Sequence, residues 1–250
     1  MTESQPQPIR PAATVIIARD ASPQYEIFML QRTNAAAFAG GMYVFPGGRV
    51  DDADGSKDYP PLLSGPSSEQ ALQQEALGEG WQSYWLAGIR ETFEEAGLML
   101  AYDGNEQLLS YSTDNHQRFD DYRQQLHKGD ISLAEICRKE NLKLAVNQIH
   151  FFNRFVTPPG RHRRFDTRFF IAVAPPAQTG FHDGHETINS TWISPTAALE
   201  KFNQGEFGLM KVTEKQLETL GQYQSTQELI DMAKNNKDFP TFRPTAPPAD

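Results

Sequence analysis

Three glutamates crowd one short stretch of the chain. Glu91, Glu94 and Glu95 follow Arg90 and precede Gly97. Spacings of three and four residues place side chains on one face of an α-helix, so these carboxylates are neighbours. Like charges at this distance repel each other unless a cation lies among them, and oxygen ligands suit Mg²⁺ or Mn²⁺. The pattern predicts a helical platform for a hard divalent cation, with an ordinary charged outer face as the alternative.

A helix over residues 84–98 must position these carboxylates. Its apolar residues Ile89, Phe93 and Leu98 can hold the opposite side against a core, and Gly97 is a typical C-terminal signal. Upstream, apolar stretches at 13–18, 25–31 and 42–45 predict three strands, the last of which ends in Pro46-Gly47-Gly48. Two adjacent glycines allow close approach of the backbone to another group.

The chain between and beyond these elements predicts further strands and helices. Residues from about 55 to 83 are acidic and then rich in Pro, Ser and Gly, so we expect an insertion with one short helix at 68–77. Downstream we expect helices at 116–127 and after Ser132, strands at 149–157, 168–174 and 187–193, and helices opening at Ser194, Thr213 and Ser225. This order favours an α/β or α+β sandwich.

Composition limits the partners. The net charge of −9, from 32 acidic and 23 basic residues, argues against a nucleic-acid or anionic-membrane binder. Cys137 is the only cysteine, and no apolar run is long enough to span a bilayer, which together predict a cytoplasmic protein. We expect one domain over residues 11–235, an N-terminal tail at 1–10 and a Pro-rich tail at 236–250. A homodimer stays open as an alternative to a monomer.

The acidic helix and the glycines before it resemble the Nudix box. Gly48 stands at the glycine of that pattern, Asp54 at its first acidic residue, and Arg90 to Gly97 at its arginine–glutamate core. Between Asp54 and Arg90 lie 35 residues, a longer spacer than the usual one. Such an insertion in an exposed loop costs little, about 0.6 kcal/mol per doubling of loop length. The resemblance implies an α/β/α sandwich with a mixed central sheet and additional helices from the insertion and the C-terminus.

One branch of the superfamily, resembling peroxisomal coenzyme A diphosphatases, has a lengthened box of this type. It is similar to this chain also in the segments 163–170 and 183–192. The family resemblance implies that the Gly48 carbonyl, Glu94 and Glu95, together with Glu91, hold Mg²⁺ or Mn²⁺. It also implies that Glu91 orients or deprotonates the attacking water and that Arg90 braces the glutamates.

A glutamate outside the box can supply the base instead. Glu186 lies just before the strand at 187–193, where related enzymes often place a further acidic ligand or base. The alternative is a loop carboxylate in a polar turn. His182 and His185 lie just before it as further candidates, although loop histidines are more often solvated than catalytic.

Arginines are the expected substrate ligands. The segment Arg161-His162-Arg163-Arg164, with Arg168 nearby, is the densest basic cluster of the chain. One guanidinium group can bind two phosphate oxygens at once, so we expect Arg163, Arg164 and Arg168 to bind a second phosphate or a nucleotide. The alternative is that this segment is a solvated turn between strands. Arg32 resembles a substrate-side arginine of the family.

These observations predict a metal-dependent hydrolase that cleaves a nucleoside diphosphate linked to another group. By resemblance, the leading substrate is coenzyme A or an acyl-coenzyme A. ADP-ribose or a dinucleotide such as NADH stays open, because the box positions the metal and the diphosphate and not the flanking groups. The alternative from another class is a Nudix-fold binding or regulatory module that has lost catalysis.

Overall fold

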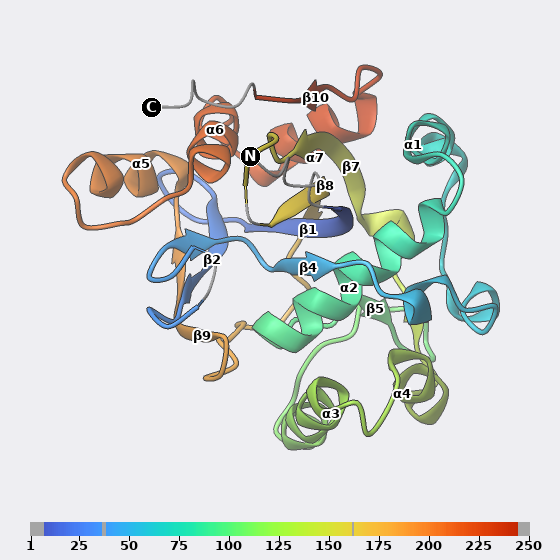
Figure 1. Ribbon diagram of the computed structural model, residues 1–250. Coiled ribbons are helices and arrows are strands. Elements are labelled where there is room, and N and C mark those ends of the chain that lie inside the picture. The colour runs from blue at the N-terminus through green and yellow to red at the C-terminus, as the bar shows by residue number, and fades with distance from the viewer. Residues whose placement is uncertain (1–7, 37–38, 162, 245–250) are drawn as a thin grey trace, which may run out of the picture.

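The computed structural model describes residues 8–36, 39–161 and 163–244, which form a mixed sheet between two layers of helices (Figure 1). The sheet contains β1 (Ile9–Arg19), β2 (Glu26–Arg32), β3 (Tyr43–Val44), β4 (Gly47–Arg49), β7 (His150–Val156), β8 (Arg164–Val173), β9 (Thr187–Ile193) and β10 (Thr241–Phe242). A separate two-stranded sheet pairs β5 (Ala101–Tyr102) with β6 (Lys143–Leu144). The helices are α1 (Ala71–Leu77), α2 (Trp81–Ala96), α3 (His116–Lys128), α4 (Leu133–Glu140), α5 (Pro195–Asn203), α6 (Lys211–Leu220) and α7 (Thr226–Asn235).

The centre of the sheet is the parallel pair β1 and β8, in which Thr14 lies beside Phe169. One half of β1 pairs with β4 and the other half with β2, both antiparallel. Because side chains alternate along a strand, β1 and β8 contribute to two separate cores. Val15 and Phe170 face the core under α2, whereas Ile16 and Ile171 face the core under α5, α6 and α7. The expected α/β sandwich with a mixed sheet is therefore confirmed.

The helix α2 carries the glutamates and crosses the sheet directly over β1. It ends at Gly97, whose positive φ of 68° is the left-handed conformation expected of a helix-terminating glycine. Gly88 permits the close contact with β1, since a Cβ there would lie 2.9 Å from a methyl carbon of Val15. Trp85 anchors the N-terminal half, because its indole N–H donates to the carbonyl of Ile149 at 2.9 Å. Contacts in the N-terminal half and at the middle of α2 thus fix its position against β1 and the segment before β7.

The 3-10 helix η1 (Asp52–Gly55) precedes the expected insertion. The insertion folds along one side of α2 and contains the short 3-10 helices η2 (Pro60–Leu62) and η3 (Ser68–Gln70) before α1. Two buried glutamines attach it to the sheet. The amide of Gln70 donates to the carbonyls of Val146 and Ile149, and Gln73 accepts from the backbone N–H of Phe151. Buried amides that are fully bonded hold a segment in one register. The insertion is therefore a packed part of the domain and keeps Asp54 in a defined place.

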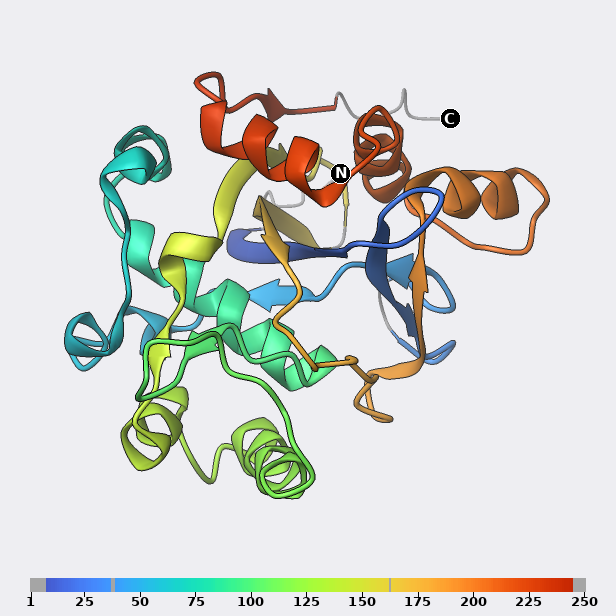
Figure 2. The same ribbon diagram turned by 180° about the vertical axis from the view of Figure 1, so that it is seen from behind.

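The other side of the sheet is covered by the C-terminal helices (Figure 2). Ser194 and Ser225 cap α5 and α7 as expected, but α6 begins at Lys211 and not at Thr213, which is buried inside it. Part of the expected C-terminal tail is ordered: Thr241 and Phe242 form β10 beside β7. The outer parts of both expected tails, 1–7 and 245–250, lie outside the described residues.

None of the helices in these described ranges is long and apolar enough for a bilayer crossing.

Candidate active site

Arg90 is the centre of a network of charges at the middle of α2. Its guanidinium donates to both carboxylate oxygens of Asp54, at 2.9 and 3.0 Å, and to the Arg49 carbonyl at 2.9 Å. It also donates to Glu91 at 3.0 Å and to Glu94 at 3.1 Å. Burial lowers the pKa of Arg90, but the bond to Asp54 and the nearby glutamates outweigh burial and raise it, so the side chain stays charged. Arg90 is therefore a fixed cation that holds two of the three glutamates in place.

Asp54 occupies the position that the lengthened box predicts for its first acidic residue. Its side chain is 1% exposed and also accepts from the backbone N–H of Asp51 at 2.8 Å. The two halves of the box, 35 residues apart in sequence, are joined by this bidentate pair. The insertion leaves that contact intact because η1 closes back onto α2 before the excursion begins.

Glu91 lies directly against the glycine turn. A Cβ at Gly48 would fall 2.4 Å from a carboxylate oxygen of Glu91, so only glycine allows this close approach. Burial, opposed by Arg90, raises the pKa of Glu91 to about 7. The carboxylate and the backbone of the turn therefore lie next to each other in a site largely withdrawn from water.

Glu95 is the most deeply placed of the three glutamates. One of its carboxylate oxygens accepts from the backbone N–H of Gly47 at 2.9 Å. Burial and the nearby charge of Glu91 raise its pKa well above the usual value, and the Gly47 bond and Arg32 only partly offset them. Burial also raises the pKa of Glu94, against the effect of Arg90. Three carboxylates thus share one helix face with too little positive charge nearby to stabilise all of them as anions.

A cavity of about 400 Å³ opens on Glu91 and Glu95, and we name it the sheet cavity because β1, β4 and β8 form its floor. Gly48, Arg32 and Glu186 also line it. An oxygen of Glu186 lies 3.5 Å from a guanidinium nitrogen of Arg32. The Nε of Arg32 is buried and has no hydrogen-bond partner among the described residues. The structure therefore brings both candidate bases, Glu91 and Glu186, to one cavity.

The donor set suits a hard divalent cation, because Glu91, Glu95 and Gly48 present oxygen atoms to the same cavity. Burial raises the pKa of Glu91 and of Glu95, because a carboxylate anion is poorly stabilised away from water. A divalent cation bound between them would stabilise both anions. In the described part of the chain, no three His, Cys, Asp or Glu side chains are already grouped around one point. Glu91 and Glu94 bind Arg90 instead, and Glu94 lines a different cavity.

The structure separates the arginines that the sequence groups together. Arg163 lines the sheet cavity, but Arg164 and Arg168 do not. Arg168 is 7% exposed, pairs with Asp166 at 2.6 Å, and lies with its guanidinium carbon 4.2 Å from the ring centre of Tyr84. Because β8 begins at Arg164, alternate residues point to opposite faces, and Phe165 rather than Arg164 faces the cavity. His162 lies outside the described residues.

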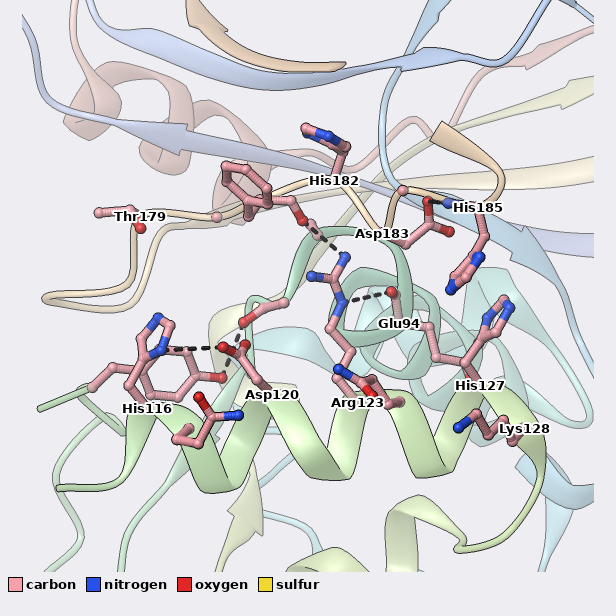
Figure 3. A pocket seen from close by; sticks show the side chains of 18 residues that line it. Glu94, His116, Asp120, Arg123, His127, Lys128, Thr179, His182, Asp183 and His185 are labelled. Carbon is pink, nitrogen blue, oxygen red and sulfur yellow. Dashed lines mark hydrogen bonds and ion pairs between the residues drawn. The ribbon is translucent and has the colours of Figure 1, made fainter. Parts of the chain in front are cut away.

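A second cavity, of about 700 Å³, lies between α3, the C-terminal end of α2 and the loop 179–185 (Figure 3), and we name it the α3 cavity. Arg123 on α3 builds its wall by donating to the backbone carbonyls of Glu94, Glu95 and Phe181, at 2.6 to 2.8 Å. Sequence reasoning did not identify Arg123, since nothing in the spacing of 94, 123 and 181 indicates that topology brings them together.

The mixed sheet between helices, with the glutamates of α2 beside a glycine turn at one cavity, defines a Nudix fold. The solved structure of a NUDIX hydrolase from Alicyclobacillus acidocaldarius has this fold too, with a TM-score of 0.75 at 24% identity over 90% of this chain and 96% of that one. More narrowly, the family model described as the NUDT19 Nudix domain matches residues 67–212, and the chain belongs to that family. The resemblance inferred from the sequence is confirmed.

Curated relatives carry a more specific name. Proteins named acyl-coenzyme A diphosphatase NUDT19 are 27% identical in Gallus gallus, over 80% of this chain, and 23% identical in Homo sapiens, over 82% of it. The chain spans 65% and 63% of the length of those two relatives.

Proposed function

We propose that this chain is a hydrolase of coenzyme A and acyl-coenzyme A that depends on Mg²⁺ or Mn²⁺. It would cleave the diphosphate bond and release adenosine 3',5'-bisphosphate and a phosphopantetheine. The observation that carries the proposal is the contact of Glu91 with Gly48 in a cavity that Glu95 and Arg32 also line. The family and the name of the relatives support the choice of substrate.

In this proposal the Gly48 carbonyl, Glu94 and Glu95, with Glu91, hold the metal ion. The bound ion supplies Lewis acidity and neutralises charge on the diphosphate. Arg90 keeps Glu91 and Glu94 in position, because Asp54 fixes the guanidinium from the opposite side. A buried Glu91 beside the glycine turn is placed to accept the proton of the attacking water. The water oxygen then bonds to one phosphorus while the bridging P–O bond breaks, and the other phosphate leaves.

Glu186 is the alternative base, and the structure gives it a specific partner. Its ion pair with Arg32 holds the carboxylate beside the cavity that Glu91 and Glu95 also line. In either assignment Arg32 lines the same cavity as the two acidic groups and offers its Nε to a phosphate oxygen. Arg163 binds a further phosphate of the nucleotide half.

The test is to incubate the full chain with Mg²⁺ or Mn²⁺ and a panel of coenzyme A, acetyl-coenzyme A, ADP-ribose, NADH and diadenosine polyphosphates. Products are identified by mass. The proposal predicts adenosine 3',5'-bisphosphate from the coenzyme A compounds, with a higher kcat/KM than for the others. Preferred cleavage of ADP-ribose or NADH would contradict the substrate, and tight ligand binding without any turnover would contradict the enzyme.

The proposal includes a cytoplasmic location and no nucleic-acid or membrane partner, supported by the net charge of −9. Cell fractionation with an antibody against the chain tests the location, and light scattering of the pure protein distinguishes a monomer from a homodimer.

A further inference from the structure

The two cavities are lined by neighbouring residues of α2. Glu94 lines the α3 cavity, whereas Glu91 and Glu95 line the sheet cavity. In the loop before β9, two neighbouring residues also line different cavities. His185 lines the α3 cavity, and Glu186 lines the sheet cavity. A diphosphate bound beside Glu94 and Glu95 would therefore lie next to both cavities. Such a division suits a substrate made of two different halves joined by a diphosphate.

The α3 cavity has the character of a site for an amide-containing chain. It is lined by four of the six histidines of the sequence, His116, His127, His182 and His185. The rings of His127 and His185 stack, with centres 5.4 Å apart and planes at 10°, close to Glu94 in Figure 3. Imidazole groups both donate and accept hydrogen bonds, which matches amide N–H and C=O groups.

The rim of the same cavity offers an apolar contact. Phe181 is 64% exposed, an unusual state for a phenyl ring, and stacks on His182 with ring centres 4.5 Å apart. The backbone carbonyl of Phe181 is held by Arg123, so the ring projects from a fixed point of the loop. An exposed ring on a fixed backbone suits contact with an aliphatic segment of a ligand.

The sheet cavity has a different character. Phe45, Phe155, Phe165 and Arg163 line it, which combines aromatic faces with a guanidinium group. Aromatic faces suit a purine ring, and a guanidinium binds a phosphate in a bidentate manner. Among the described residues, the α3 cavity is lined by Lys128 and by one arginine, Arg123, which already donates to three backbone carbonyls. Arg32, Arg49 and Arg163 line the sheet cavity, so it offers more guanidinium groups to a 3'-phosphate than the α3 cavity does.

We propose that the α3 cavity receives the pantetheine arm of the substrate, while the sheet cavity receives the 3'-phosphoadenosine half. This inference rests on the proposed function and goes beyond it, since it assigns each half of the molecule to a named cavity. The residues around Phe181 and α3 then determine which arm is accepted. They form a specificity site that touches no reacting atom.

Two substitutions test the assignment without altering the glutamates. Phe181→Ala removes the exposed ring, and Gln124→Trp, at an exposed position of α3 that lines the cavity, fills part of the space. Leu72→Ala is the matched control, because Leu72 is a similarly exposed apolar residue on α1, away from both cavities. The dissociation constants of 4'-phosphopantetheine and of adenosine 3',5'-bisphosphate are measured separately by calorimetry, with no turnover required.

The proposal predicts that both α3-cavity variants weaken 4'-phosphopantetheine by about tenfold or more and leave adenosine 3',5'-bisphosphate unchanged. Arg163→Ala should give the opposite pattern. The assignment would be overturned if the α3-cavity variants changed the dissociation constants of both ligands equally, or that of the nucleotide alone. It would also be overturned if the unchanged protein did not bind 4'-phosphopantetheine. Failure of the proposed function shows differently, as absence of coenzyme A cleavage by the unchanged protein in the product assay.

Discussion

Replacing Asp54 by alanine tests whether the two separated halves of the box form one structural unit. The change removes both bonds from the Arg90 guanidinium to Asp54 and leaves this buried cation with Glu91, Glu94 and the Arg49 carbonyl as its remaining hydrogen-bond acceptors. Loss of one partner of a buried ion pair costs about 3–5 kcal/mol. For a chain of this size each kcal/mol lowers the midpoint of thermal unfolding by roughly 2–4 °C. We therefore expect a midpoint lower by about 6–20 °C.

The assay is thermal unfolding followed by circular dichroism, with urea unfolding to obtain the free energy. Asp52→Asn is the control, because Asp52 lies in the same 3-10 helix and is exposed. Asp54→Glu retains the charge and should keep most of the stability. If Asp54→Ala unfolds within about 1 kcal/mol of the control, the range of an exposed ion pair, the argument that this contact fixes Arg90 is refuted.

Three further outcomes are expected. Glu91→Gln should lower kcat by about 10²- to 10⁴-fold. If Glu91→Gln stays active and Glu186→Gln shows this loss instead, the base is Glu186. Arg163→Ala should raise KM for coenzyme A, whereas Arg164→Ala, on the other face of β8, should leave it unchanged; the reverse result would refute the assignment of faces. Burial lowers the pKa of His150 to about 4, below its usual 6.5, so the unfolded chain binds the extra proton between these values. The free energy of unfolding therefore has the full contribution of neutral His150 above pH 6.5 and loses about 3 kcal/mol of it as the pH drops to 4. His150→Gln should remove this pH dependence from the free energy measured by urea unfolding. An unchanged pH dependence in that variant would contradict the role of His150.

The sequence was sufficient to predict α2 and its functional face. The helix period, the terminal Gly97 and the glutamate spacing all depend on residues close together in the chain, and each is a strong local signal. The strand at 187–193 and the serine caps of α5 and α7 were predictable for the same reason. The fold class followed from the order of such elements.

The arrangement of side chains between distant segments could not be predicted in this way. The strand expected at 168–174 begins four residues earlier, at Arg164. Its alternation of faces therefore extends to Arg164, which together with Arg168 does not line the cavity. The α3 cavity joins Glu94, Arg123 and the loop 179–185, which have no common sequence pattern. Thr241 and Phe242 form a strand because they pair with β7, a contact between segments far apart in the sequence. The Pro-rich composition of the segment alone therefore suggested a loose tail.

Binding of Mn²⁺ tests the central claim most directly, and electron paramagnetic resonance measures it without any substrate. The unchanged chain should bind the ion, and Glu94→Gln and Glu95→Gln should each weaken binding by at least about tenfold, the range seen when a ligand or its support is lost. Glu79→Gln, an exposed glutamate outside the site, should bind as the unchanged chain does. Undiminished Mn²⁺ affinity in both site variants would contradict the claim that the carboxylates of α2 hold the metal.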